Sequence, residues 1–216
     1  MRNLNKFYIG GTWVTPSSTR DFPVVNPATE GQIGTVFLAD NNDVNAAVQA
    51  AKQAFEADFG TSKSVRLQRL ERLLTATEGR LEDLAQAMMQ EMGAPISMAR
   101  AAQADAAIGH LQGFIQALRV QQEKETLENG DVLVREPIGV CGLITPWNWP
   151  INQIALKVIP ALAAGASCVL KPSEHTPLSA VVYAEIIAAA GFPDGMFNLI
   201  HGDGPTAGAA LSRHPD

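Results

Sequence analysis

Short apolar runs alternate with helical segments through the C-terminal part of the chain, and this alternation most constrains the fold. Residues 138–145, 167–171 and 196–200 have the composition of buried strands. Residues 151–164 have the spacing of a helix, and Thr176 can cap another. Strands separated by helices of this length are joined by right-handed crossovers. The sequence therefore predicts an α/β fold with a doubly wound, Rossmann-like parallel sheet.

The segment before this sheet predicts an N-terminal β-hairpin and then helices. Gly10-Gly11 separates two short β-type runs, which is a hairpin signal. Apolar side chains recur at helical spacing over residues 44–55, where Asn42 or Asp43 can cap the helix. The same stripe continues over residues 67–88, which predicts one further helix. A third helix is expected from about residue 96 to residue 118.

Residues 124–137 are predicted to form a hairpin arm. Asn129-Gly130 is a turn pair, and β-type residues follow it at 132–134. The arm has no obvious partner within the chain, and an exposed strand edge can pair with another strand. We therefore expect three parts: residues 1–123, the arm at 124–137 with an edge on which another strand can dock, and residues 138–216, the first part of the sheet, which is incomplete at its C-terminus.

Charge and cysteine content exclude several classes of protein. Sixteen Lys and Arg against twenty-two Asp and Glu give a net charge of −6, which argues against nucleic-acid binding. The two cysteines cannot form a disulfide framework, and the four histidines lack metal-ligand spacing, so no metal site is expected. Neither a signal peptide nor a membrane span is recognisable. We expect a soluble, cytoplasmic chain.

Ligands of doubly wound sheets bind at the carboxyl ends of the strands, so three segments are candidate sites. In the first, T-P-W-N-W-P, the Asn148 amide can donate to an oxygen that gains negative charge. The alternative is that Asn148 caps the helix that follows Pro150.

The second segment, K-P-S-E, places Lys171 at the end of an apolar strand with Glu174 three residues later. A Lys and a carboxylate together can grip a ribose diol. The carboxylate would repel a 2′-phosphate, which favours NAD over NADP, although NADP remains possible. The alternative is a surface salt bridge of little energetic value.

The third segment, H-G-D-G-P-T-A-G, resembles a stretched dinucleotide fingerprint through Gly202, Gly204 and Gly208. The alternative is a glycine turn with close helix packing. Cys141 and Cys168 lie in buried strand patterns with no base nearby in sequence, so neither is expected to be a nucleophile.

Taken in order, these segments resemble the N-terminal part of the NAD(P)-dependent aldehyde dehydrogenase superfamily. The resemblance covers nearly the whole chain. The matching stretches are FYIGGTW (residues 7–13), VNPATEG (25–31), EMG (91–93), REPIGVCGLITPWNWP (135–150), PALAAGASCVLKPSE (160–174), GFPDG (191–195) and GPTAGA (204–209).

The resemblance implies a role for each candidate residue in the oxidation of an aldehyde to a carboxylic acid. Asn148 resembles the oxyanion donor, and Lys157 resembles a lysine that supports the nucleophile loop. The implied coenzyme contacts are Ile144, Thr145, Pro146 and Trp147 at the nicotinamide half, Lys171, Ser173 and Glu174 at the adenosine ribose, and Gly204 and Gly208 near the adenine. The implied substrate-tunnel residues are Trp149, Gln153 and Leu156. The hairpin at 124–137 resembles the arm that pairs with a neighbouring subunit, which implies a homo-oligomer.

Three motifs of the family are not in these 216 residues. They are the Gly-Gln-x-Cys stretch with the catalytic cysteine, the Glu-Leu-Gly-Gly-Lys stretch with the general base, and the Gly-Ser-Thr-x-x-Gly pyrophosphate turn. The family reaction needs the thiolate as nucleophile. We therefore expect the catalytic domain to be absent and the chain alone to be inactive. The alternative is a non-catalytic fragment that binds nucleotide or docks onto a partner subunit.

Overall fold

The computed structural model describes residues 4–216 and centres on a five-stranded sheet with helices on both faces. The strand order is β2-β1-β9-β8-β7. The parallel strands are β7 (Val140–Ile144), β8 (Ser167–Lys171) and β9 (Phe197–Leu199). The hairpin of β1 (Phe7–Ile9) and β2 (Thr12–Val14) joins the same sheet, because β1 pairs antiparallel with β9. The predicted α/β class is confirmed, and the sheet is mixed.

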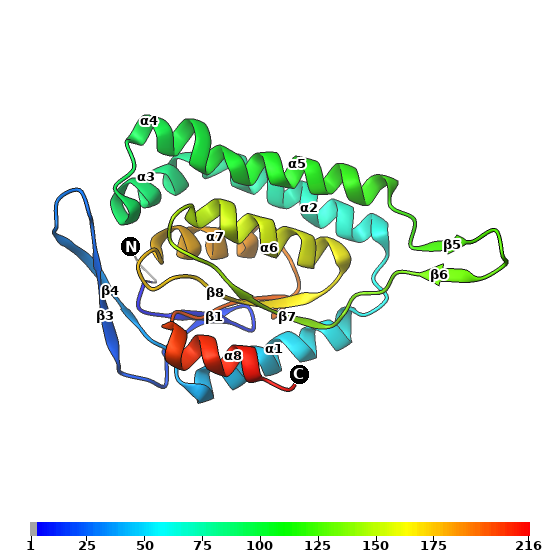
Figure 1. The fold of residues 1–216 in the computed structure, drawn as a ribbon, viewed down its shortest axis with the longest axis horizontal. Helices are drawn as coiled ribbons and strands as arrows, with labels where there is room; N and C mark the ends of the chain where they lie inside the picture. The colour runs from blue at the N-terminus through cyan, green and yellow to red at the C-terminus, as the bar shows by residue number, and fades with distance from the viewer. Residues whose placement is uncertain (1–3) are drawn as a thin grey trace.

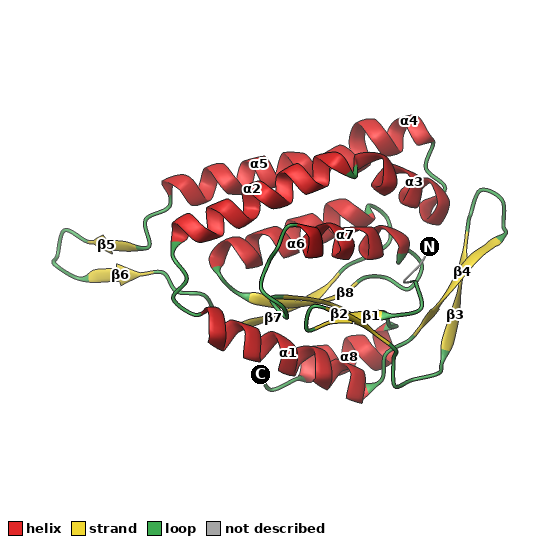
Figure 2. Ribbon diagram, turned by 180° about the vertical axis from the view of Figure 1, so that it is seen from behind, coloured by secondary structure: helices red, strands yellow, loops and turns green. Residues whose placement is uncertain are grey.

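The helices form three layers around this sheet (Figures 1 and 2). Helices α6 (Pro150–Ala164) and α7 (Leu178–Ala189) cover one face of the sheet, and α1 (Asn41–Asp58) and α8 (Ala209–Arg213) cover the other. A second helical layer lies outside α6 and α7. It contains α2 (Lys63–Gly79), α3 (Leu81–Met92), α4 (Ile96–Met98), a π-helical turn (Ala99–Ala104) and α5 (Asp105–Val120).

The deepest part of the core is the layer between the sheet and the outer helices. All five residues of β8 are buried, and α7 is buried over most of its circumference because α2, α3, α6 and β9 surround it. Tyr183 and Phe197 are among the largest fully buried side chains. By contrast, β7 forms one edge of the sheet and is half exposed, with Ile144 41% exposed. The strand predicted as buried at 138–145 is therefore an edge strand, and no residue of β7 is buried.

The helix boundaries correct two sequence-based predictions. The cap of α1 is Asp40, whose carboxylate accepts from the backbone N–H of Asn42 and of Asp43, and the Asp43 carboxylate in turn accepts from the Asp40 N–H. The single helix predicted over 67–88 is two helices, because the chain bends at Arg80. The cap of α1 was missed because side chains that interact across a turn are not visible in apolar periodicity.

The cap predicted for α7 is also wrong. Thr176 makes no capping hydrogen bond, and its hydroxyl is buried without a partner among the described residues. The N-cap position of α7 belongs to Pro177, which has no side-chain acceptor. The first N–H groups of α7 are instead satisfied by Glu91 of α3.

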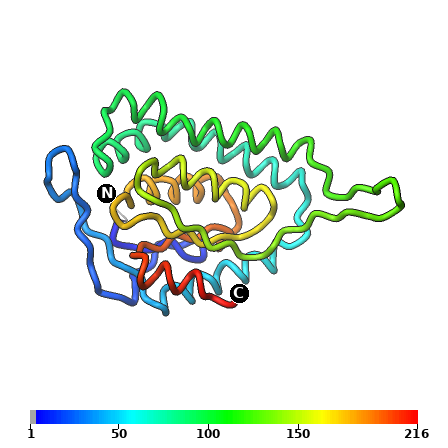
Figure 3. Tube along the Cα trace, in the orientation of Figure 1, coloured from blue at the N-terminus to red at the C-terminus, as the bar shows by residue number. Residues whose placement is uncertain are grey.

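Two hairpins lie outside the main sheet. One pairs β3 (Asp21–Val25) with β4 (Gln32–Phe37). The other is the arm of residues 124–137, in which β5 (Lys124–Thr126) pairs with β6 (Val132–Val134), and it projects from the body of the molecule (Figure 3). The predicted hairpin is therefore present, and its two strands pair only with each other.

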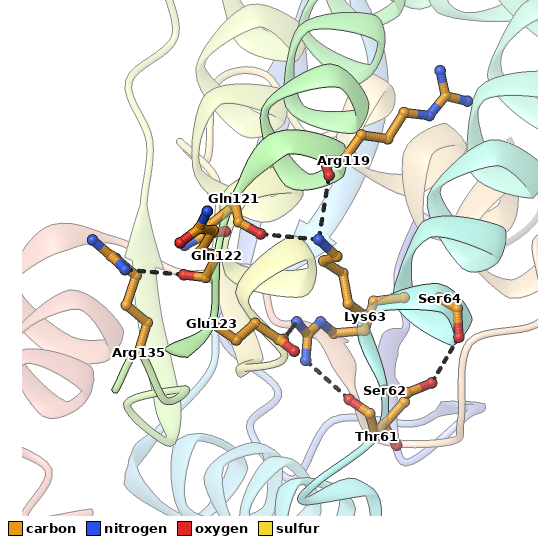
Figure 4. Close-up of polar contacts among 10 residues, drawn as sticks. Thr61, Ser62, Lys63, Ser64, Arg119, Gln121, Gln122, Glu123 and Arg135 are labelled. Carbon is orange, nitrogen blue, oxygen red and sulfur yellow. Dashed lines mark hydrogen bonds and ion pairs between the residues drawn. The ribbon is translucent and has the colours of Figure 1, made fainter. Parts of the chain in front are cut away.

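A cluster of polar contacts holds the root of the arm (Figure 4). The Lys63 Nζ donates to the carbonyl oxygens of Arg119 at 3.2 Å and Gln121 at 2.9 Å, where α5 ends. The Arg135 guanidinium donates to the Gln122 carbonyl at 2.9 Å, and Arg66 pairs with Glu123. These contacts join the segment that leads into the arm to the start of α2, and Arg135 ties the returning leg to the same segment.

Candidate functional site

The three candidate segments follow the carboxyl ends of the three parallel strands. Ile144 of β7 is in register with Lys171 of β8, and Leu170 is in register with Leu199 of β9. Backbone hydrogen bonds continue past the strand ends, from Thr145 N to the Lys171 oxygen at 3.2 Å. The strands therefore deliver residues 145–150, 171–177 and 201–208 to one edge of the sheet, as the sequence predicts.

Lys171 is buried at this edge, and its ammonium joins two strand ends. The side-chain Nζ donates to the carbonyl oxygens of Pro172 at 3.0 Å and Gly202 at 2.8 Å. It lies 3.9 Å from the Glu174 carboxylate. Burial lowers the pKa of Lys171, and the negative charges of Glu174 and Asp203 oppose this shift. Because Lys171 is only 3% exposed, the alternative of a surface salt bridge is wrong.

The Lys171 ammonium keeps one hydrogen-bond donor that no acceptor within residues 4–216 engages. An ammonium has three donors, and two of them are used by the carbonyl oxygens of Pro172 and Gly202. The Glu174 oxygen lies beyond direct hydrogen-bonding distance. A hydroxyl group placed between them could accept a hydrogen bond from Lys171 and donate one to Glu174, which would use the remaining hydrogen-bonding capacity of both side chains.

The glycine-rich segment lies against the same lysine. A Cβ at Gly208 would lie 3.7 Å from the Lys171 Cε and 3.3 Å from the Asp203 carbonyl oxygen. Asp203 caps the π-helical turn Gly204–Gly208 by accepting from Thr206 N at 2.9 Å. The structure thus brings Lys171, Glu174 and Gly208 together. Gly204 faces open space, with no heavy atom within 4 Å of the position of a Cβ.

Ser173 stabilises the loop between β8 and α7. Its hydroxyl accepts from the His175 N–H at 3.3 Å, and its carbonyl accepts from the Thr176 N–H at 3.1 Å. Both bonds are local turn contacts. The side chain of Ser173 therefore shapes the loop that carries Glu174.

Asn148 is exposed, and no hydrogen bond engages its side chain within residues 4–216. The helix that follows starts at Pro150, and its N-cap is Trp149 without a side-chain cap. The alternative in which Asn148 caps this helix is therefore wrong. Its amide is available as a donor, although no hydrogen bond joins it to the group around Lys171.

Two predicted tunnel residues, Gln153 and Leu156, lie on the less buried side of α6 together with the predicted support Lys157. Gln153 and Lys157 are half-buried and Leu156 is 41% exposed, whereas Ile154, Val158 and Ile159 face the core. Of the remaining predicted coenzyme contacts, Trp147 is 57% exposed, Pro146 is exposed and Thr145 is buried. Trp149 is half-buried.

Glu91 is a polar residue of this region that the sequence reasoning did not assign. It is 3% exposed, and its two carboxylate oxygens accept from the N–H groups of Leu178 and Ser179, the latter at 3.1 Å. Burial raises the pKa of Glu91 to about 8, and the hydrogen bonds from Ser179 and Leu178 act in the opposite direction. The signal in the sequence is its position on the apolar stripe of Leu84 and Met88, where a carboxylate needs a partner.

Beside Glu91 lies a largely apolar cavity of about 650 Å³. It is lined by the end of β3, the end of α3 and the rings of Trp147 and His175. The Phe22 and His175 rings meet edge to face at 5.2 Å between centroids. The outer side of the loop between β8 and α7 therefore faces a cavity.

The two cysteines have the environment of inert thiols. Cys141 and Cys168 are opposite each other in the register of β7 and β8. Burial raises the pKa of both, so neither is activated as a thiolate. Burial, with a smaller effect of Lys171, lowers the pKa of the wholly buried His201 to about 3. No cluster of three metal-ligating side chains occurs in the described part of the chain.

Comparisons with known proteins agree with this geometry. The model of the aldehyde dehydrogenase family matches residues 13–216. The chain belongs to the aldehyde dehydrogenase family. The resemblance drawn from the sequence motifs is therefore confirmed.

Among curated relatives of this aldehyde dehydrogenase chain, a 3-succinoylsemialdehyde-pyridine dehydrogenase of Pseudomonas sp. is 49% identical over 217 residues, covering 100% of the chain and 45% of the relative. A crystal structure of aldehyde dehydrogenase from Bartonella henselae is 47% identical with a TM-score of 0.96, over 98% of this chain and 45% of that one. A mutant of aldehyde dehydrogenase C from Pseudomonas syringae, complexed with NAD+ and octanal, is 47% identical with a TM-score of 0.96, over 99% and 44%.

The chain thus spans about 45% of the length of these relatives and superposes on their N-terminal portions. Within residues 4–216, no helix has both the length and the apolarity needed to cross a membrane.

Proposed function

We propose that this chain is the coenzyme-holding part of an aldehyde dehydrogenase that oxidises an aldehyde to a carboxylic acid with NAD+. The observation that carries the proposal is the buried Lys171 beside Glu174 and Gly208 at the carboxyl edge of the sheet. Two structures of related aldehyde dehydrogenases are described as NAD+ complexes, which supports the same coenzyme here.

The residues around Lys171 fit a ribose. A ribose hydroxyl placed between Lys171 and Glu174 would accept from the ammonium and donate to the carboxylate. The glycine at position 208 allows its backbone to pack closely against Lys171, since a Cβ there would lie 3.7 Å from the Lys171 Cε. The charge of Glu174 would repel a 2′-phosphate, so NAD+ is expected to bind more tightly than NADP+.

The remaining proposed roles concern the reacting end of the coenzyme. NAD+ supplies the hydride acceptor. The strand end at Ile144, Thr145, Pro146 and Trp147 would form the wall beside the nicotinamide. The free amide of Asn148 would donate to the aldehyde oxygen as that oxygen gains negative charge.

Helix α6 would line the approach of the substrate. Trp149, Gln153 and Leu156 are proposed tunnel residues, and Lys157 is a proposed support for the nucleophile loop. The nucleophilic thiolate and the general base of the family are outside these 216 residues, so the chain by itself is proposed to be inactive.

Coenzyme binding by the 216-residue chain tests this function. NAD+ titrations are followed by isothermal calorimetry or by NMR for the chain, for Lys171→Met and for Glu174→Gln, with Glu82→Gln of α3 as the control. We expect both site variants to weaken binding about 10-fold, because hydrogen bonds to charged groups contribute about 1.5 to 3 kcal/mol. Unchanged affinity in both variants would contradict the ribose clamp, that is, the binding of one ribose hydroxyl by Lys171 and Glu174 together.

A second candidate function is a non-catalytic fragment that docks through its arm. The observation that favours it is that β5 and β6 pair only with each other, while Val132, Leu133 and Val134 are all exposed. We propose that the arm pairs with a second copy of the chain to form a homo-oligomer. Analytical ultracentrifugation of the chain and of Leu133→Lys tests this, and a chain that stays monomeric at high concentration would contradict it.

A further inference from the structure

The loop between β8 and α7 carries the half-buried Glu174 between buried residues on either side. It extends over residues 172–177, and its outer side faces the cavity next to Trp147. At its first residue it is held by the Lys171 ammonium, which donates to the Pro172 oxygen. The position of Glu174 therefore depends on how the other end of the loop is fixed.

That other end is fixed from a distant part of the chain. The N-cap position of α7 is Pro177, which cannot satisfy the first N–H groups of the helix. Glu91, at the end of α3, accepts from Leu178 N and Ser179 N, 87 and 88 residues further along the chain. The α3 and α7 helices pack against each other, so the carboxylate is held on a rigid support.

A carboxylate is the group that meets this need. Its two oxygens accept one N–H each, whereas an amide has one acceptor and one donor and would leave one N–H facing a donor. The site is buried, so water does not replace the lost acceptor. Aspartate is one methylene shorter and would have to move α3 or α7 to keep both contacts.

We propose that Glu91 is a positioning residue for coenzyme binding: it fixes the start of α7 and thereby the loop that presents Ser173 and Glu174 to the adenosine ribose. This inference rests on the proposed function of Lys171 and Glu174. Glu91 does not touch the coenzyme. Its effect is transmitted through the backbone of residues 174–178.

The test is the ratio of two dissociation constants, those for NADP+ and NAD+, measured at about pH 8.5, above the pKa of Glu91. The 216-residue chain is compared with Glu91→Gln, Glu91→Asp and the control Glu82→Gln, which alters an exposed carboxylate of the same helix. We expect Glu91→Gln to weaken NAD+ binding about 5-fold, as is typical of coupling between sites. NADP+ binding should change less, because a displaced Glu174 no longer repels the 2′-phosphate.

A merely structural role of Glu91 would lower both affinities together and leave their ratio unchanged. An unchanged ratio overturns the inference, and so do unchanged dissociation constants for NAD+ and NADP+ in Glu91→Gln. Glu174→Gln separates the two proposals. If it removes the preference for NAD+ while Glu91→Gln does not, the ribose clamp stands and the role of Glu91 is wrong. If Glu174→Gln has no effect, the proposed function itself fails, and the inference fails with it.

A measurement on the unaltered chain decides the matter if the Glu91 variants do not fold. Coupling between two sites is reciprocal, so NAD+ binding should strengthen the contacts of Glu91. We expect hydrogen exchange at the amides of Leu178 and Ser179 to slow about 5-fold on saturation with NAD+. Exchange at these amides that does not respond to NAD+ overturns the inference.

Discussion

Strand β8 and strand β6 have similar apolar content and opposite environments. The five residues of β8 are all buried between two neighbouring strands and two layers of helices, whereas Val132, Leu133 and Val134 of β6 are all exposed. The difference comes from topology, because β8 is paired on both sides and β6 pairs only with β5. Apolar composition therefore predicts a strand but does not predict whether it is buried.

The largest effect on stability is expected from a cavity in β8. Leu170→Ala should lower the free energy of unfolding by about 2 to 5 kcal/mol, because Leu170 is wholly buried. Leu133→Ala, its counterpart in the arm, should change the free energy by less than about 0.5 kcal/mol. Urea unfolding of both variants measures the difference, and equal losses would show that the arm belongs to the cooperative core.

A smaller effect is expected from protonation of His201. Burial and then Lys171 lower its pKa to about 3 in the folded chain, against about 6.5 when unfolded. The unfolded state therefore binds a proton that the folded state does not, and stability falls as the pH falls from about 6.5 to 3. Between pH 7 and pH 4.5 the wild type should lose about 2 to 3 kcal/mol more than His201→Leu.

Urea unfolding of the two proteins at both pH values tests this difference. Parallel loss of stability in the wild type and in His201→Leu would show that His201 does not stay neutral in the fold.

The capping box of α1 is expected to contribute about 1 kcal/mol. Asp40→Ala removes the acceptor for the N–H groups of Asn42 and Asp43 and should lower the free energy of unfolding by that amount. Asn42→Ala serves as the control, because Asn42 was a candidate cap from the sequence and is exposed in the structure. Thermal unfolding distinguishes them, and a larger loss in Asn42→Ala would reverse the assignment.

The smallest effect on global stability is expected at the root of the arm. Lys63→Met removes the two hydrogen bonds to the end of α5 that Figure 4 shows. Both bonds lie at an exposed position, so water can replace the lost donor. The free energy of unfolding should change by less than about 0.5 kcal/mol. Amide exchange in β5 and β6 should nevertheless become several-fold faster, since local opening needs fewer broken contacts. Unchanged amide exchange would mean that the hairpin is rigid without the two hydrogen bonds of Lys63.

Local signals in the sequence predicted most of the elements correctly. The apolar run 167–171 coincides with β8, and the spacing over 151–164 coincides with α6. The Asn129-Gly130 turn predicted the hairpin arm, in which β5 pairs with β6. What the sequence did not reveal is long-range: the pairing of β1 with β9 and the capping of α7 by Glu91 join segments far apart in the chain.

In the candidate site, too, the sequence predicted the local contacts and not the long-range ones. Lys171 and Glu174 are three residues apart, and their proximity follows from the strand end that carries them. The contact of Gly208 with Lys171 required the order of β8 and β9 in the sheet. Glu91 was overlooked because a carboxylate on an apolar stripe shows that a partner is needed without showing which partner it is.

Helix α7 has almost no side that faces water, since α2, α3 and α6 surround it above the sheet. Until its neighbours are present, a helix of this kind exposes hydrophobic surface and is prone to aggregate. Translation makes α2 and α3 before α7, so the nascent chain already carries the cover when α7 leaves the ribosome. A circular permutant that places residues 63–92 after α7 would reverse this order and expose the helix during synthesis.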